Sequence, residues 1–306
     1  MGPAGTGGLQ AGRWDEALAS AAVDSPVEQL VDLDRYPLHG PDGQGFRDVV
    51  SSARSQLTGT GAVELTGFLV PAGIDAMVAE ADVLAARGHH SEGVGTAYLE
   101  YPDFSLPDGH PRLTWGHYGV GAVPYDLMPE ASLLRQLYEW EPLRNLVEQI
   151  LDRGPIHRYA DPFGALNLAV MEEGDELQWH FDQTDFVVSV ALQTADHGGE
   201  FEVYPRIRSA EDERYDDVAA ALAGIRAGVV TLPMVPGTLL VFEGRYSLHR
   251  VSPIGGGRVR HVGLLAYDTA AGTMGSELLL KNRYGRTEPF PEPPVSWPLA
   301  SGVSTS

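Results

Sequence analysis

The second half of the sequence alternates short apolar runs with turn residues. From residue 163 onward the runs are separated by turns such as Glu173-Gly174-Asp175 and Pro236-Gly237. Many short strands at this spacing are typical of an all-β sandwich or barrel. The expected strands are 164–172, 177–181, 185–193, 200–205, 229–233, 237–243, 247–252 and 258–268. About eight strands fit a double-sheet jelly roll.

The first half of the sequence is expected to be largely helical. The clearest helix is 71–87, because Pro71 stands in its first turn and Gly88 directly follows its end. A strand is expected before it, at 62–70. The remaining helices expected there are 14–22, 45–57, and 131–153 with a break at Pro142. A further short helix, at about 213–224, is expected to interrupt the strands of the second half.

The whole chain, 1–306, is expected to form one domain. It has 306 residues, of which 43% are hydrophobic, and a single decorated barrel or sandwich of this size is common. Its expected parts are a disordered Gly-rich start (1–12), a helical region (13–155) with a loop-rich lid at 88–130, the β core (156–285) and a Pro-rich tail (286–306).

Charge and composition limit the partners. The net charge of -21 argues against nucleic acids and anionic membranes, which bind basic surfaces. The absence of cysteine excludes disulfides, thiolate metal sites and thiol nucleophiles. No apolar run approaches the ~18 residues of a membrane span, and Met1–Trp14 lacks the pattern of a secretory signal. We therefore expect a cytoplasmic monomer or homodimer that acts on a small molecule.

Three side chains have the chemistry of a non-haem iron site. His180 and Asp182 end an expected strand, where residues two apart share a face, and His249 follows 69 residues later. Two imidazoles and one carboxylate form the facial triad that leaves positions on Fe(II) open for substrate and dioxygen. We expect the two strands to face each other across the barrel and so to bring the three donors together.

Each member of this triad also has a simpler interpretation. His-x-acid pairs arise by chance, and His90 and Glu92 form a second one, which we interpret as part of a solvated Gly-rich loop. A lone histidine in an apolar strand, such as His249, is more often a hydrogen-bonded structural residue. The strand context of all three residues together favours the metal site.

An arginine on the last expected strand can bind a second carboxylate. Arg260 follows His249 by eleven residues, and Arg258 shares its face of the strand. A guanidinium matches a carboxylate geometrically and stays charged when buried. Arg260 is followed by more apolar residues, so we expect it to hold the far carboxylate of 2-oxoglutarate, with Arg258 as the alternative.

These motifs resemble the Fe(II)/2-oxoglutarate-dependent oxygenases. More narrowly, the chain is similar to the group that contains free-amino-acid halogenases and their hydroxylase relatives. The likeness covers about residues 30–287. It is carried by the segments 178–182, 187–193, 198–202, 205–208, 236–238 and 247–253, and more weakly by 33–37, 110–112, 137–140 and 161–167.

The resemblance implies a double-stranded β-helix core with a helical N-terminal region over the active site. His180, Asp182 and His249 match the iron ligands, and Arg260 matches the residue that binds 2-oxoglutarate. Halogenating members replace the carboxylate ligand with Gly or Ala. Because this chain keeps Asp182, the resemblance implies hydroxylation, although desaturation or cyclisation would use the same ligands.

The resemblance also implies a substrate, a free amino acid or a close derivative in a specialised biosynthetic pathway. Arg112 matches a position that contacts the substrate carboxylate in amino-acid-acting relatives, but a salt bridge that anchors a loop is an equal alternative. Trp115 and Asn167 are expected to line the same substrate site. Two other functions stay open: a cupin-like Zn(II) or Mn(II) enzyme, and a non-catalytic 2-oxoglutarate-binding protein.

Overall fold

The computed structural model describes residues 27–289. The expected disordered start at 1–12, the expected helix at 14–22 and most of the Pro-rich tail lie outside these residues.

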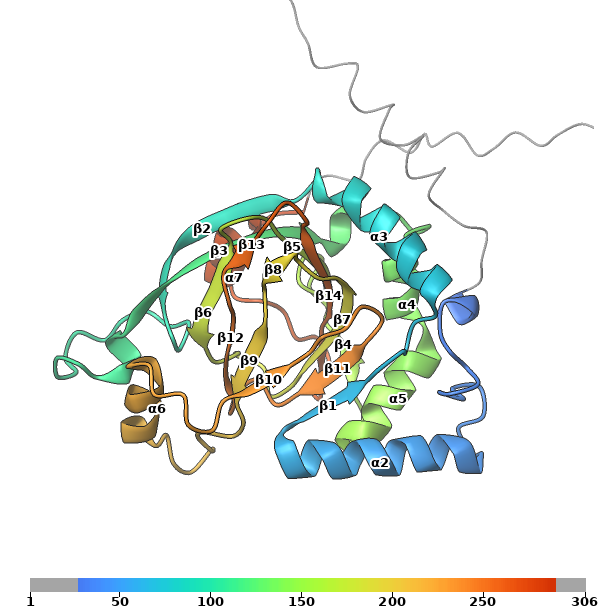
Figure 1. Ribbon diagram of the computed structural model, residues 1–306, viewed down its shortest axis with the longest axis horizontal. Coiled ribbons are helices and arrows are strands. Elements are labelled where there is room, and N and C mark those ends of the chain that lie inside the picture. Colours follow the sequence, from blue (N-terminus) through green and yellow to red (C-terminus); the bar gives the residue numbers. More distant parts are fainter. Residues whose placement is uncertain (1–26, 290–306) are drawn as a thin grey trace, which may run out of the picture.

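A curled antiparallel sheet forms the body of the protein (Figure 1). Its strand order is β1 (Ala62–Leu65), β11 (Leu239–Phe242), β7 (Val187–Gln193), β14 (Arg260–Leu265), β5 (Leu166–Met171), β3 (Trp115–Pro124), β6 (Glu176–His180), β12 (Leu248–Val251), β9 (Phe201–Tyr204) and β10 (Val230–Leu232), with β2 (His89–Thr96) added to β3. Two short strand pairs form separate sheets: β13 (Ile254–Gly255) with β8 (His197–Gly198), and β15 (Tyr267–Asp268) with β4 (His157–Arg158). The predicted mainly-β, jelly-roll class is confirmed.

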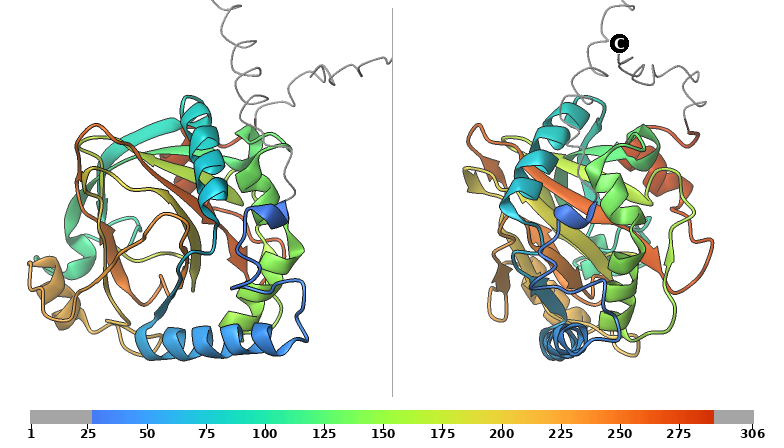
Figure 2. Two further views of the ribbon diagram at one scale, coloured as in Figure 1. Left: turned by 45° about the vertical axis from the view of Figure 1, so that its right-hand side comes forward. Right: turned by 90° about the vertical axis from the view of Figure 1, so that its right-hand side faces the viewer.

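Helices cover one outer side of this half-barrel (Figure 2). These are α2 (Gln44–Thr60), α3 (Pro71–Ala85), α4 (Leu133–Glu139) and α5 (Glu141–Leu151). Helix α6 (Tyr215–Leu222) lies at the opposite side in Figure 1, and α7 (Glu277–Tyr284) contacts β2 and β3. Short 3-10 turns occur at Val27–Gln29 (η1), Pro111–Leu113 (η2) and Tyr125–Leu127 (η3). No helix between residues 27 and 289 has the length and hydropathy to cross a membrane.

The two largest apolar clusters among the described residues pack against opposite faces of the sheet. The larger packs the helices onto the outside of the sheet, and includes Leu137, Leu146 and Val190, all fully buried. The smaller lies on the other sheet face and includes Met171 and Phe242. The first cluster holds the barrel rigid from outside, while the second surrounds the space in which the candidate site lies.

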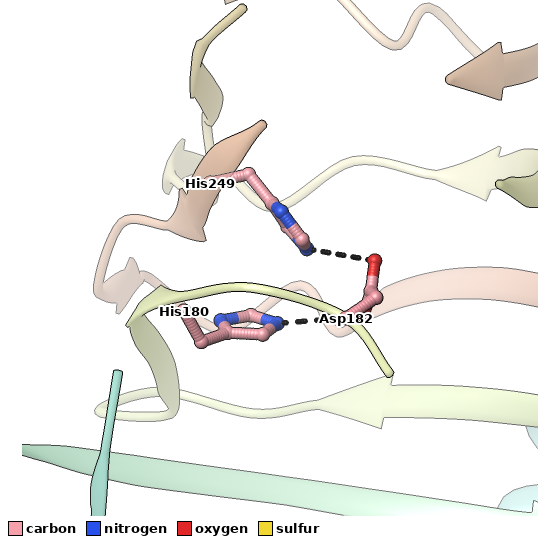
Figure 3. Close-up of side chains that lie close together, drawn as sticks. All are labelled: His180, Asp182 and His249. Atoms are coloured by element: carbon pink, nitrogen blue, oxygen red, sulfur yellow. Dashed lines mark ion pairs between the residues drawn. The ribbon is translucent and has the colours of Figure 1, made fainter. Parts of the chain in front are cut away.

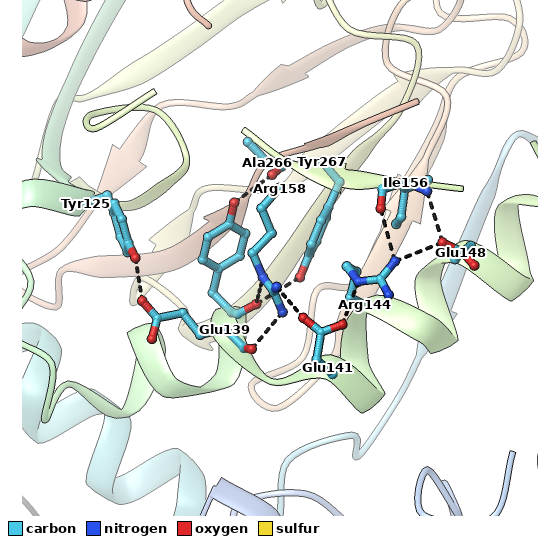
Figure 4. A network of polar contacts seen from close by, with 10 residues as sticks. Tyr125, Glu139, Glu141, Arg144, Glu148, Ile156, Arg158, Ala266 and Tyr267 are labelled. Atoms are coloured by element: carbon cyan, nitrogen blue, oxygen red, sulfur yellow. Dashed lines mark hydrogen bonds and ion pairs between the residues drawn. The ribbon is translucent and has the colours of Figure 1, made fainter. Parts of the chain in front are cut away.

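The predicted break between two helices at Pro142 is confirmed. Helix α4 ends at Glu139, Trp140 is extended, and Pro142 stands in the first turn of α5, where its missing N–H removes no helical bond. Figure 4 shows how Arg158 fixes this junction, by donating hydrogen bonds to the carbonyl oxygens of Tyr138 and Glu139. Strand β4 is thereby fastened to the helical layer.

The expectation that 88–130 forms a loop-rich lid is wrong for much of its length. Strands β2 and β3 occupy it and pair over eight residue positions. Both strands are rich in glycine, so their sequences lack the residue pattern that predicts a strand. At least one of these glycines is required by packing. A Cβ on Gly116 would lie 1.7 Å from the side-chain oxygen of Gln178. The expected strand at 62–70 is also shorter, since β1 ends at Leu65.

Candidate metal centre

His180 and His249 lie on neighbouring strands of the sheet. His180 ends β6, and its Cα is paired with that of His249 on β12. The expectation that the two strands face each other across the barrel is therefore wrong. They are hydrogen-bonded neighbours, and directly paired residues in an antiparallel ladder project to the same face. The two imidazole rings have centroids 4.3 Å apart.

Asp182 completes a cluster of three donors (Figure 3). It lies just beyond β6, and its Oδ1 is 4.0 Å from His180 Nε2 while its Oδ2 is 3.2 Å from His249 Nε2. All three donor atoms lie within 4.8 Å of one another, and no other such cluster of three occurs in the described part of the chain. The structure thus brings together the three residues that the sequence singled out.

Backbone carbonyls fix which nitrogen of each histidine faces the cluster. His180 Nδ1 lies 2.7 Å from the carbonyl oxygen of Gln178, and His249 Nδ1 lies 2.9 Å from that of Ser247. Only a protonated Nδ1 can donate to a carbonyl, so each Nε2 faces Asp182 and carries a free lone pair when its ring is neutral. Such contacts to the second ring nitrogen are usual for metal-binding histidines.

The electrostatics of the three groups suit a divalent cation. Burial, assisted by the neighbouring His249, lowers the pKa of His180 to about 4, so this ring is neutral at neutral pH. Burial alone would raise the pKa of Asp182, but the two imidazoles hold it below its usual value. Burial alone would lower the pKa of His249, but Asp182 raises it above its usual value. Metals bind the neutral imidazole and the ionised carboxylate, so a cation at this site competes with a proton on His249.

The backbone around Asp182 is shaped to hold its carboxylate. The Asp182 N–H donates to the Gly244 carbonyl oxygen at 3.2 Å. A Cβ on Gly244 would lie 2.1 Å from Asp182 Oδ2, so no larger residue fits there without displacing the carboxylate. Asp182 Oδ2 is buried and lies 3.2 Å from His249 Nε2, and a buried carboxylate oxygen beside an imidazole nitrogen fits a site for a cation.

A cavity of about 450 Å³ contains both the cluster and Arg260. Arg260 opens β14 and is only 6% exposed. Its one hydrogen bond runs from Nη1 to Met171 Sδ at 3.7 Å, and it forms no ion pair with any residue of 27–289. Burial lowers the pKa of Arg260 to about 10, which leaves it charged at neutral pH. A buried guanidinium without a carboxylate fits an anionic ligand.

The shape of the wall accommodates Arg260. A Cβ on Gly199 would lie 3.0 Å from Arg260 Cδ, and Gly199 has a φ of +70°, where a side chain is strained. Arg258, the alternative, precedes the strand and is half exposed. It is 3.5 Å from Asp196 and does not line the cavity.

The three residues expected to bind substrate lie in different places. Asn167, on β5, lines the cavity, and its buried Oδ1 has no hydrogen-bond partner. Trp115 lines a second cavity next to the first. Arg112 lines neither cavity: its Nε donates to Tyr215 Oη at 3.1 Å and its guanidinium pairs with Glu100 and Glu213. These contacts support the anchoring interpretation of Arg112, which ties η2 to α6.

His90 and Glu92 form no metal site, but they do not lie in a loop either. Both are on β2. His90 Nε2 lies 2.8 Å from Asp175, and Glu92 lies 3.1 Å from His117. They serve as cross-strand contacts of the sheet.

Some residues of the site escaped the sequence analysis. Gly199 packs closely against Arg260, and Gly244 against Asp182, and no local sequence pattern predicts such contacts. Arg283, on α7, borders both cavities. A signal for its helix was present, because Ser276 caps the first turn and Gly285 follows the last.

The chain is similar to known proteins in sequence and in fold. The family described as Halogenase D matches residues 123–277, just over half of the 306 residues. AviO1 from Streptomyces viridochromogenes has a similar structure, with a TM-score of 0.51 at 20% identity over 73% of this chain and 96% of that one. The epimerase SnoN, crystallised with Fe3+, alpha ketoglutarate and nogalamycin RO, has a TM-score of 0.53 at 17% identity over 80% and 94% of the two chains. At these identities the structural likeness shows the fold alone. Among curated proteins, none matches this sequence.

Proposed function

This chain belongs to the Halogenase D family, and from that premise we propose that it is an Fe(II)/2-oxoglutarate-dependent oxygenase. The proposed reaction hydroxylates an unactivated C–H bond of a small carboxylate-bearing molecule, a free amino acid or a derivative of one. One observation carries the proposal. The cavity that is lined by His180, Asp182 and His249 is also lined by the buried guanidinium of Arg260, which forms no ion pair with any residue of 27–289.

Each of these residues has a defined part in the proposal. The two Nε2 atoms and the Asp182 carboxylate would hold Fe(II) from one side only, which leaves positions open for cosubstrate, substrate and dioxygen. Arg260 would bind the distal carboxylate of 2-oxoglutarate. Iron and 2-oxoglutarate together supply the activation of dioxygen, with release of succinate and carbon dioxide.

The surroundings of Arg260 favour a specific binding site for an anion over incidental burial of the side chain. A charge at this depth is costly without a partner. Gly199 provides room for its side chain, and no described acid forms an ion pair with the guanidinium. An arriving dicarboxylate would be oriented by the guanidinium at one end and by the metal at the other.

Asp182 favours hydroxylation over halogenation within this family. Its carboxylate provides the third donor of the cluster, and the absence of a side chain at Gly244 leaves room for that carboxylate. A halide would need the metal position that the Asp182 carboxylate would take. Desaturation and cyclisation remain compatible with the same ligands, and the product distinguishes them.

Two other functions are weighed against the oxygenase. A cupin-like enzyme with Zn(II) or Mn(II) could use the same three donors, but it would give Arg260 no carboxylate to bind. A non-catalytic 2-oxoglutarate-binding protein would use Arg260, but it would not need three ligands arranged around an open coordination face.

The test is product analysis under turnover conditions. The protein, loaded with Fe(II), is supplied with 2-oxoglutarate, dioxygen and a panel of amino acids and their N-acyl derivatives. We expect succinate that depends on His249, and a substrate that gains one oxygen atom by mass spectrometry. A loss of two hydrogens would instead indicate desaturation or cyclisation. If succinate formation is absent, or is unchanged in His249→Ala, the oxygenase proposal is wrong.

A further inference from the structure

A second cavity adjoins the one that holds the metal cluster. It measures about 310 Å³ and lies between the β2–β3 ribbon and α7. His180, Leu99, Gln183 and Arg283 border both cavities, so the two meet directly beside a proposed iron ligand. A ligand that reaches the metal from this side therefore passes Arg283.

The walls of the second cavity are unusually apolar for exposed surface. Nine large hydrophobic side chains are exposed among the described residues, and four of them line this cavity. These four are Val94, Tyr101, Trp115 and Leu279, which are 63%, 77%, 49% and 40% exposed. Exposed apolar side chains that gather around a hollow mark a binding surface.

Arg283 provides a cation at the junction of the two cavities. Its side chain is partly buried, and within residues 27–289 it forms no ion pair and no hydrogen bond. Arg286, three residues later, shows the contrast, because both of its terminal nitrogens bind Asp126 at 2.7 Å.

We propose that Arg283 and the second cavity form the substrate subsite, in which the guanidinium binds an anionic group and the apolar walls hold a hydrophobic body. The inference rests on the proposed function, and it specifies the substrate class of that site. The carbon to be oxidised would enter the first cavity beside His180, while the remainder of the molecule lies along β2 and β3.

This arrangement favours a molecule larger than a free amino acid. A free amino acid would place its carboxylate on Arg283 and its side chain near the metal, and would leave the second cavity empty. An N-acylated amino acid, or a carboxylate branched in the same way, has one group for Arg283, one for the metal side of the first cavity and one for the second cavity. It offers a carboxylate at the junction, a reactive chain toward His180 and an apolar arm toward Trp115.

The subsite is tested by ligand binding without turnover. Binding of N-acetyl-L-phenylalanine, its uncharged amide and unacylated L-phenylalanine is measured by calorimetry on the full chain, without iron or 2-oxoglutarate. We expect the N-acetyl acid to bind more tightly than its amide by roughly tenfold or more, since a charge-assisted hydrogen bond is involved. We also expect it to bind more tightly than the unacylated amino acid.

Variants assign these preferences to residues. Arg283→Gln should abolish the preference for the N-acetyl acid over its amide. Arg283→Lys, which keeps the positive charge, should retain part of this preference. Lys281→Gln, which removes the same charge from an exposed position of the same helix, should leave the preference intact. Trp115→Ala should weaken both acetylated probes and leave the unacylated one unchanged.

The outcomes separate this inference from the proposed function. A parent protein without any preference for acid over amide overturns the subsite, as does a preference that survives in Arg283→Gln. Because no turnover is involved, intact binding together with absent succinate formation would contradict the oxygenase and not the subsite. Succinate formation without Arg283-dependent binding would do the reverse.

Discussion

Replacement of Arg260 by methionine should stabilise the ligand-free protein and abolish its response to 2-oxoglutarate. Burial lowers the pKa of Arg260 from its ordinary value to about 10, a fall of more than two units. Each pKa unit corresponds to about 1.4 kcal/mol, so the buried charge costs the folded protein about 3 kcal/mol. Because the folded pKa lies below the unfolded one, this cost is fully present at neutral pH and disappears only as the pH rises above about 10. Methionine has a similar volume and would lie beside Met171.

The assay is urea unfolding of the metal-free protein, combined with titration of 2-oxoglutarate into the Zn(II)-loaded protein. We expect Arg260→Met to raise the free energy of unfolding by about 1–3 kcal/mol, and to weaken 2-oxoglutarate binding by about 2–5 kcal/mol. Arg258→Met is the control. Its half-exposed pairing with Asp196 should change either quantity by less than about 1 kcal/mol. A less stable Arg260→Met protein, or one that binds 2-oxoglutarate normally, would refute the view that Arg260 awaits an anionic ligand.

Three further predictions concern the metal centre and its supporting structure. Gly244→Ala should displace the Asp182 carboxylate and so weaken Zn(II) binding, measured by calorimetry, roughly 10- to 100-fold. Gly59→Ala in α2 is the control, because a Cβ there would meet nothing within 4 Å. It should bind Zn(II) normally and gain about 0.5–1 kcal/mol of stability. Zn(II) at about 100 times its Kd should stabilise the parent protein by about 2.7 kcal/mol in a thermal melt, and a similar gain in His249→Ala would show that the ion binds elsewhere. Burial raises the pKa of Glu80 despite its hydrogen bonds, so its contribution to stability is largest below pH 4.5 and is lost as the pH rises through the raised value. The deficit of Glu80→Gln in urea unfolding should therefore be smaller at about pH 8 than at low pH, and a deficit that grows with pH would contradict the sign.

The strands of the core were predictable because their sequence carries both alternation and turn residues. Val187–Gln193 and Leu239–Phe242 are apolar runs between clear turns, and both are strands. Strands β2 and β3 carry five glycines between them and few β-branched residues, so no pattern indicated them. They are held by backbone pairing along their length and by the close packing of Gly116 against Gln178. Such tertiary support leaves no local trace.

The three donor residues of the site were predictable from the sequence, whereas the strand pairing that brings them together was not. Residue types and spacing singled out His180, Asp182 and His249, but the pairing of β6 with β12 is a property of sheet order. The role of Gly244 depends on a contact across 62 residues of sequence, between positions 182 and 244. Capping signals could have predicted the helix that carries Arg283, although its approach to the metal cavity depends on how α7 packs against β2.

The most direct test of the central claim is the visible absorption of the anaerobic protein mixed with Fe(II) and 2-oxoglutarate. If the three donors and Arg260 act as one site, a weak charge-transfer band should appear, should be lost in His249→Ala, and should require far more 2-oxoglutarate in Arg260→Met. A band that is absent from the parent protein, or that persists unchanged in His249→Ala, would contradict the account.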